Sequence, residues 1–169
     1  MRIGYFADGP WSHIALEKIL SDKEITIEFI CARYDNPDQV LEKRAKEEGI
    51  DFWTSENINS NEILLKIVSY QCDILVSMSF NQIFGADILD LCPGGIINCH
   101  AGKLPFYRGR NILNWALIND ENEFGITVHY VDVGIDTGDI ISQSTFSITD
   151  EDDYSTLLER SYLGCAEVL

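Results

Sequence analysis

Long hydrophobic runs and basic residues are both scarce in this sequence of 169 residues. No apolar run approaches the roughly 20 residues that a membrane-spanning helix needs, and the opening residues MRIGYFADGP lack the features of a signal peptide. The 12 Lys and Arg residues are outnumbered by 28 Asp and Glu residues, which gives a formal net charge of −16. Without a membrane span or a signal peptide, we expect a cytoplasmic protein. Because nucleic acids and membrane surfaces are anionic, we expect neither as a partner of so acidic a chain.

Cysteine provides no disulfide framework. The five cysteines are scattered, odd in number and never in C-x-x-C spacing, which argues against both disulfides and a zinc site. We therefore expect reduced, mostly buried cysteines and no bound metal. Cys99 lies between Asn98 and His100, but neighbouring residues of a strand face opposite sides, so we expect Cys99 to pack in the core.

Hydrophobic periodicity in the first 80 residues alternates between two kinds of segment. Strand-like segments cover residues 1–7, 24–32, 50–53 and 73–80, and helix-like segments cover residues 11–20, 37–49 and 61–71. Strands alternating with helices predict an α/β fold with a mostly parallel central sheet, wound in the Rossmann manner and flanked by helices. Pro37 and Gly49 are expected to open and close the second helix.

The second half of the sequence changes character. After a strand over 95–100 and a helix over 111–120, residues 124–131 and 140–148 alternate with a period of two. This pattern predicts added strands with an exposed face. An acidic segment then leads into a helix over 150–169 that shows no C-cap signal, so we expect this helix to be cut short.

Polar residues end the strand over residues 95–100. Asn98 and His100 are two residues apart, so they face the same side of the strand, at the carboxyl end where open α/β sheets bind ligands. An amide can stabilise a developing oxyanion, and an imidazole can move a proton near neutral pH. In the later loop VDVGIDTGD, nearby glycines would present Asp136 as a third group. The simpler interpretations are a strand end that satisfies loop backbone groups and a solvated acidic turn.

These residues, taken together, resemble a known family. The segments that carry the resemblance are Asn98-Cys99-His100, Leu104-Pro105 to Gly109, and Asp136-Thr137-Gly138. They resemble the N-x-H, L-P-x-x-x-G and D-x-G motifs of formyltransferases that use 10-formyltetrahydrofolate, such as the catalytic domain of methionyl-tRNA formyltransferase. The resemblance runs at least from Val76 to Gln143, and it implies a single N-terminal catalytic domain over residues 1–169. One position departs from the family, which commonly has a serine where this chain has Gly102 or Lys103.

The resemblance implies an enzyme that moves the formyl group of 10-formyltetrahydrofolate to a substrate amine without a metal. Asn98 and a protonated His100 would stabilise the negative oxygen of a tetrahedral species, and Asp136 would hold the imidazole cationic or relay a proton. The residues that would line the folate site are Phe80, Gln82, Ile83, Phe84, Val131, Asp132 and Val133. Phe80 and Ile83 could equally be core residues. His129 could line the cleft or be satisfied at its strand end.

The acceptor amine is suggested by the segment FYRGRNILNWALIND. Its R-G-R and L-N-W resemble the sugar-nucleotide N-formyltransferases, which implies a dTDP-linked amino-dideoxyhexose as acceptor, a role in lipopolysaccharide or other polysaccharide biosynthesis, and a possible homodimer. The acidic composition argues against tRNA as the acceptor. The residues expected to contact the sugar nucleotide are Asp8, Gly9, Trp11, Lys103, Tyr107 and Arg108.

Other functions remain open at this point. They are a methionyl-tRNA formyltransferase, a formyltetrahydrofolate hydrolase, and a fragment that binds folate or nucleotide without turnover. A nicotinamide-dependent enzyme is not expected, because FADGPWS has one glycine where the dinucleotide fingerprint G-x-G-x-x-G needs three.

Overall fold

The order of the strands places a crevice near the middle of the sheet. In the computed structural model, which describes residues 1–169, one sheet has the strand order β3-β2-β1-β4-β5-β6-β7. The strands are β1 (Arg2–Ala7), β2 (Thr26–Ala32), β3 (Asp51–Thr54), β4 (Ile74–Met78), β5 (Ile96–His100), β6 (Glu123–Tyr130) and β7 (Ile140–Ser147). β1 to β5 run parallel, and β6 and β7 are antiparallel. β2 and β3 lie on one side of β1, and β4 and β5 lie on its other side. The direction of strand order therefore reverses between β1 and β4, and open α/β sheets bind ligands at such a switch point.

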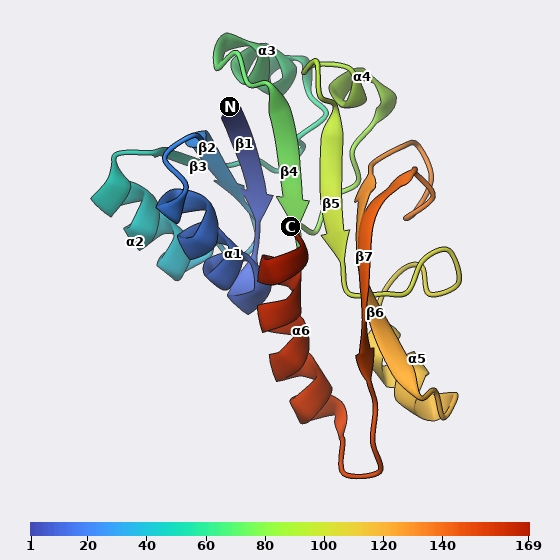
Figure 1. Cartoon of the computed structure of the whole chain (residues 1–169). Coiled ribbons are helices and arrows are strands. Elements are labelled where there is room, and N and C mark those ends of the chain that lie inside the picture. Colours follow the sequence, from blue (N-terminus) through green and yellow to red (C-terminus); the bar gives the residue numbers. More distant parts are fainter.

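Helices cover both faces of this sheet (Figure 1). They are α1 (Gly9–Ser21), α2 (Gln39–Glu48), α3 (Asn61–Ser69), α4 (Ala86–Leu89), α5 (Ile112–Ile118) and α6 (Tyr154–Val168). Neighbouring residues of β1 point to opposite faces: Tyr5 packs with apolar residues of α1, α2 and α6, and Phe6 packs with those of α3 and α4. The predicted α/β fold, Rossmann-like and mostly parallel, is confirmed.

The second helix begins two residues later than its proline suggests. Asp38 is the N-cap of α2, and its carboxylate accepts hydrogen bonds from the backbone N–H groups of Val40 (2.9 Å) and Leu41 (3.0 Å). Gly49 closes the helix in the left-handed conformation, with φ of 70°. The closing glycine was predicted correctly, whereas the opening by Pro37 was not, because an aspartate satisfies the free amides of a first turn better than proline does.

The prediction of two added strands with an exposed face holds for β7 and is wrong for β6. β7 lies at the edge of the sheet and most of its residues are exposed, whereas β6 lies between β5 and β7 and is buried along most of its length. The polar residues that made β6 look half-exposed are buried with partners. Thr127, for example, donates a hydrogen bond to the carbonyl oxygen of Gly102 at 2.7 Å.

All five cysteines are buried and free, as expected. Cys99 packs in the core and its thiol donates to the carbonyl oxygen of Cys165, on the face of β5 opposite Asn98 and His100. None of the helices is long and apolar enough to cross a membrane.

Candidate active site

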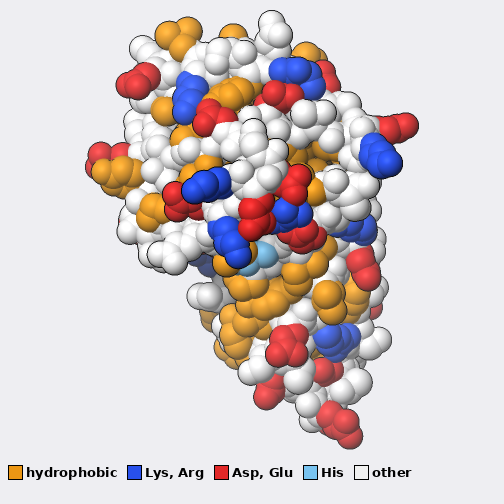
Figure 2. Space-filling view, turned by 90° about the vertical axis from the view of Figure 1, so that its left-hand side faces the viewer, with side chains coloured by type: hydrophobic (Ala, Val, Ile, Leu, Met, Phe, Trp, Pro, Cys, Tyr) orange, Lys and Arg blue, Asp and Glu red, His pale blue; other side chains and the backbone are white.

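A cavity of about 870 Å³ lies at the carboxyl ends of β1, β4 and β5, at the switch point of the sheet. Three loops supply much of its wall: the one after β4, the one after β5 and the one between β6 and β7. Asn98, His100 and Asp136 all line this cavity. Figure 2, which faces the side of α1 and α2, shows side chains of both charges gathered above a hydrophobic surface.

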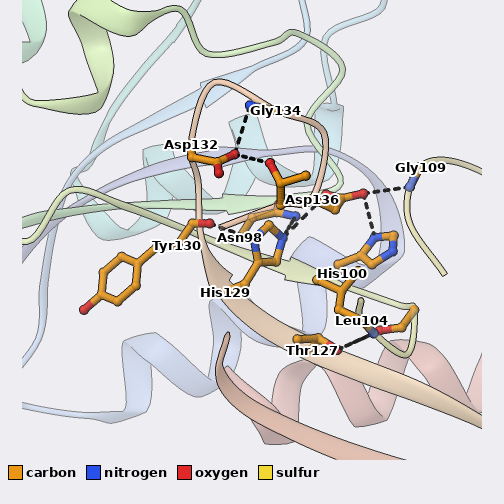
Figure 3. A network of polar contacts seen from close by, with 12 residues as sticks. Asn98, His100, Leu104, Gly109, Thr127, His129, Tyr130, Asp132, Gly134 and Asp136 are labelled. Atoms are coloured by element: carbon orange, nitrogen blue, oxygen red, sulfur yellow. Dashed lines mark hydrogen bonds and ion pairs between the residues drawn. The ribbon is translucent and has the colours of Figure 1, made fainter. Parts of the chain in front are cut away.

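His100 is fixed by the loop that follows its own strand. Its Nε2 lies 2.7 Å from the carbonyl oxygen of Tyr107, so Nε2 carries the proton and donates it. The free atom is therefore Nδ1, which lies 3.7 Å from Oδ2 of Asp136 (Figure 3). Burial lowers the pKa of His100 although the charge of Asp136 acts to raise it. The expectation of an imidazole held cationic is thus corrected, because the burial of the ring outweighs the nearby carboxylate.

Asp136 is held as an anion by groups from three segments. Its Oδ2 accepts a hydrogen bond from the backbone N–H of Gly109 at 2.8 Å, and its Oδ1 lies 3.5 Å from Nε2 of His129. Burial acts to raise the pKa of Asp136, but contacts with His129, His100 and Gly109 outweigh it and hold the pKa below its usual value. The residue itself is in the left-handed region, with φ of 51°, which turns the carboxylate toward the two imidazoles.

His129 positions Asn98 as well as Asp136. Nδ1 of His129 lies 2.8 Å from the carbonyl oxygen of Tyr130 and donates to it, which fixes the ring and leaves Nε2 facing the other two side chains. The Nδ2 amide of Asn98 lies 3.3 Å from that Nε2. His129 therefore fixes the amide group of Asn98, which also lines the cavity.

Gly102 allows His100 and the loop to approach each other. A Cβ atom at Gly102 would overlap both Nε2 of His100 and the carbonyl oxygen of Tyr107, which are the two atoms of the hydrogen bond that fixes the ring. The family commonly has a serine in this part of the loop, and this chain has glycine at position 102. In this structure glycine is the residue that fits there, so Asn98, His100 and Asp136 keep their places.

The residues predicted for the folate lie mostly where they were expected. Phe80, Gln82, Ile83, Phe84, Val131 and Asp132 line the cavity, and Val133 does not. Val133 is 77% exposed and is not part of the cavity wall, so its contact with the folate stays a prediction. Gln82 also holds the chain after β3, because its side chain donates to the carbonyl oxygen of Ser55 (2.7 Å) and accepts from the N–H of Ile58 (3.1 Å).

The residues predicted for the acceptor divide into two groups. Asp8 and Trp11 line the cavity. Gly9, Lys103, Tyr107 and Arg108 do not line it. The structure thus brings Asp8 and Trp11 to the cavity wall and places the other four beside it, and their contacts with an acceptor stay predictions.

Contacts elsewhere in the protein explain why Gly9, Lys103 and Tyr107 do not face the cavity. The N–H of Gly9 donates to Oδ2 of Asp38 at 3.0 Å and is not free for an anion. Lys103 forms an ion pair with Glu123. The hydroxyl of Tyr107 donates to Glu121 at 2.5 Å, and only the backbone carbonyl of this residue faces the site.

Four further cavity residues had no assigned role, or an open one, in the sequence: His129, Arg33, Asn81 and Arg110. Arg33 had a usable signal, because it directly follows β2 and therefore lies at the same edge of the sheet as Asn98 and His100. It pairs with Asp8 at 3.3 Å and with Asp35 at 2.7 Å. No group of three or more His, Cys, Asp or Glu side chains is arranged to hold a metal ion.

Comparisons with known proteins agree with this geometry. A family model described as formyl transferase matches residues 21–163. The chain is 37% identical over 125 residues to methionyl-tRNA formyltransferase of Geobacter metallireducens, covering 74% of this chain and 40% of that protein. It is 29% identical over 168 residues to the same enzyme of Fusobacterium nucleatum, covering 95% and 54%. The chain thus spans about two fifths to a little over half of these relatives.

Solved structures agree as well. Phosphoribosylglycinamide formyltransferase from Bacillus halodurans superimposes with a TM-score of 0.86 at 25% identity, covering 99% of this chain and 90% of that one. The expected sugar-nucleotide partner and the expected absence of a nucleic-acid partner are wrong in the light of these relatives, which are methionyl-tRNA and phosphoribosylglycinamide formyltransferases by name. Because the family model matches most of the sequence, the chain belongs to the formyl transferase family.

Proposed function

We propose that this chain transfers the formyl group of 10-formyltetrahydrofolate to a primary amine in the cavity at the switch point of the sheet. The observation that carries the proposal is the convergence of Asn98, His100 and Asp136, with His129 beside them, on one cavity in a chain of the formyl transferase family. A protein that only binds folate has no need for an amide donor, a titratable imidazole and a fixed carboxylate in contact with one another.

The cavity fits a folate. Its volume of about 870 Å³ is within the usual range for small-molecule sites. Phe80, Ile83 and Val131 offer apolar surface for a flat ring system, and Gln82 and Asp132 offer polar groups beside them. When bound there, 10-formyltetrahydrofolate would supply a formyl group attached to nitrogen, which is the group to be transferred.

Asn98 would supply the hydrogen bond to developing negative charge. Its amide nitrogen lies 3.3 Å from Nε2 of His129, so the amide is held in place before the reaction starts. A donor that is already oriented requires no reorganisation during the reaction, and for this reason oxyanion donors are worth about 10²–10³ in turnover.

His100 and Asp136 would handle the proton that the attacking amine loses. Nδ1 of His100 is unprotonated at neutral pH, because burial lowers the pKa of the ring and Nε2 is committed to Tyr107. Once Nδ1 takes a proton, the carboxylate of Asp136 at 3.7 Å stabilises the resulting cation. Asp136 itself stays ionised, since Gly109 and the imidazoles lower its pKa.

For the acceptor we favour methionyl-tRNA. This acceptor is supported by 37% identity to methionyl-tRNA formyltransferase of Geobacter metallireducens, against 25% to phosphoribosylglycinamide formyltransferase of Bacillus halodurans. The negative charge of the chain as a whole opposes binding of tRNA, but the cavity contains one arginine, Arg110, that forms no ion pair.

The test is a formyl-transfer assay followed by mass spectrometry. Purified chain is incubated with 10-formyltetrahydrofolate and either methionyl-tRNA, phosphoribosylglycinamide or no acceptor. We expect a gain of one formyl group on methionyl-tRNA, and Asn98→Ala should lower turnover by about 10²–10³. Formate released at the same rate without an acceptor would instead indicate a hydrolase, and formylation of phosphoribosylglycinamide alone would replace the acceptor but keep the reaction.

A further inference from the structure

Two arginines of this acidic chain have no carboxylate partner. Four others are paired, as shown by Arg2 with Glu28, Arg33 with Asp8 and Asp35, Arg44 with Glu17, Glu47 and Glu48, and Arg160 with Asp152. Arg108 and Arg110 form no ion pair, although acidic residues outnumber basic ones by 28 to 12. Unpaired guanidinium groups in such a protein are available to a ligand that brings its own negative charge.

Both arginines lie next to the residue that holds the site carboxylate. They flank Gly109, whose N–H donates to Asp136 at 2.8 Å, as Figure 3 shows. The same loop is fixed a second time at Tyr107, whose carbonyl oxygen accepts the hydrogen bond of His100 at 2.7 Å. Of the two arginines, Arg110 lines the cavity and Arg108 does not. Arg110 is thus presented to the cavity from a segment that is anchored to two residues of the site.

We propose that Arg110 binds a phosphate group of the acceptor and so determines which amines are formylated. This inference rests on the proposed formyl transfer. A guanidinium group can make two parallel hydrogen bonds to phosphate, which sets the orientation of the acceptor as well as its affinity. Arg33, the other arginine in the cavity, is already neutralised by Asp8 and Asp35 and is a poorer partner for an anion.

The carboxylates of the cavity strengthen this assignment. Asp8, Asp132 and Asp136 also line the cavity and would repel a phosphate placed near them. Among the cavity residues, Arg110 is the cation that no carboxylate neutralises, so a bound anion is directed to it. Methionyl-tRNA and phosphoribosylglycinamide both contain a phosphate ester, so either acceptor meets this requirement.

The kinetic test compares Arg110→Ala and Arg110→Lys with Lys46→Ala. Lys46 lies exposed on α2, forms no ion pair and is outside the cavity, so its replacement removes one positive charge without touching the site. We expect Arg110→Ala to raise KM for the phosphate-bearing acceptor about 10- to 100-fold, with kcat and KM for the folate little changed. Arg110→Lys should restore part of the loss, and Lys46→Ala should match the wild type.

A binding measurement without turnover separates this inference from the proposed reaction. ³¹P NMR line broadening of inorganic phosphate is measured with the wild type, Arg110→Ala and Lys46→Ala, all checked for folding by circular dichroism. Broadening that is lost only in Arg110→Ala supports the anion site even if no formyl transfer is found. An active enzyme whose acceptor KM is unchanged in Arg110→Ala overturns the inference while the reaction stands. Equal phosphate binding by all three proteins, or none by any, also counts against it.

Discussion

Two aspartates, Asp8 and Asp136, line the same cavity and have similar side-chain exposure, yet their pKa values are shifted in opposite directions. The side chain of Asp8 is 20% exposed and that of Asp136 is 15% exposed. Burial raises the pKa of Asp8 although Arg33 acts to lower it, whereas the pKa of Asp136 is lowered in spite of burial. The polar partners of each carboxylate therefore decide whether burial succeeds in raising its pKa.

The difference lies in the donors that each carboxylate receives. Asp8 has one long contact, 3.3 Å to Arg33, and that arginine is shared with Asp35 at 2.7 Å. The charges of Asp38 and Asp35 also oppose ionisation of Asp8. Asp136 receives the backbone N–H of Gly109 and faces two imidazoles. Its partners can change their protonation state, whereas an arginine always remains charged, so only Asp136 lies in a cluster that can exchange protons.

The largest expected effect separates the two aspartates by activity. Asp136→Asn keeps an oxygen that can accept from Gly109 but removes the charge beside His100, and we expect kcat for formyl transfer to fall by about 10²–10⁴. Asp8→Asn should leave kcat within about threefold of the wild type, because no contact joins Asp8 to Asn98 or His100. Steady-state kinetics of the two variants, side by side, checks the comparison. Equal losses of kcat would mean that both carboxylates take part in the chemistry.

A smaller loss of activity is expected when His100 is displaced from Asp136 by a neighbouring substitution. Gly102→Ala places a methyl group against Nε2 of His100 and the carbonyl oxygen of Tyr107. We expect a loss of up to about 10²-fold in kcat from displacement of the ring, and a loss of about 1–3 kcal/mol in the free energy of unfolding from overpacking.

Urea unfolding and a double variant test the cause of that loss. With His100→Ala the ring is absent, so Gly102→Ala should cost less stability in this background than in the wild type. An equal cost in both backgrounds would show that the collision involves the Tyr107 backbone alone.

The smallest expected effect concerns the free energy of unfolding, to which the two ionised aspartates should contribute with opposite signs. The folded-state pKa of Asp136 is lowered, so its ionised form stabilises the fold above the unfolded pKa of about 3.9, and this contribution is lost as pH falls through the folded pKa. The folded-state pKa of Asp8 is raised, so its ionised form destabilises the fold at neutral pH, and this penalty disappears as pH falls through the folded pKa toward about 3.9.

Urea unfolding at pH 7, 5 and 4 measures both contributions. At pH 7 we expect Asp136→Asn to lower the free energy of unfolding by about 1–3 kcal/mol and Asp8→Asn to raise it by up to about 1 kcal/mol. The difference for Asp136→Asn should persist at pH 4, whereas that for Asp8→Asn should shrink toward pH 4. Changes of the same sign in the two variants would contradict the opposite pKa shifts.

Much of the fold was predictable because the periodicity of apolar residues is a local signal. β4 and β5 are buried parallel strands, and their hydrophobic runs predicted them directly. Asn98 and His100 followed from the same reasoning, since their spacing fixes the face and the strand end fixes the edge. β6 was misjudged because Thr127 and His129 are polar residues buried with hydrogen-bond partners, a situation that periodicity cannot distinguish from exposure.

The side chains of the loop after β5 were harder to place from the sequence, for a physical reason. Gly109 has φ of 87° and Asn111 has φ of 59°, and these left-handed conformations decide which side chains of the loop enter the cavity. The site uses the backbone of Tyr107 and Gly109, and the side chains of Lys103 and Tyr107 point to glutamates elsewhere. Residue type and spacing identify the loop, but they do not encode the direction of each of its side chains.

The place of Trp11 in the cavity wall also concerns the order of folding. Trp11 of α1, which lines the cavity, donates its indole N–H to the hydroxyl of Ser161 at 3.1 Å and packs edge-on against Tyr162, with ring centroids 4.6 Å apart. These partners lie 150 residues further along the chain. During synthesis, β1 to β5 can pair before α6 has been made, but this wall of the cavity receives its final support only afterwards. A ribosome-bound chain that ends before Ser161 is thus expected to hold Asn98 and His100 on a paired sheet while Trp11 is still mobile.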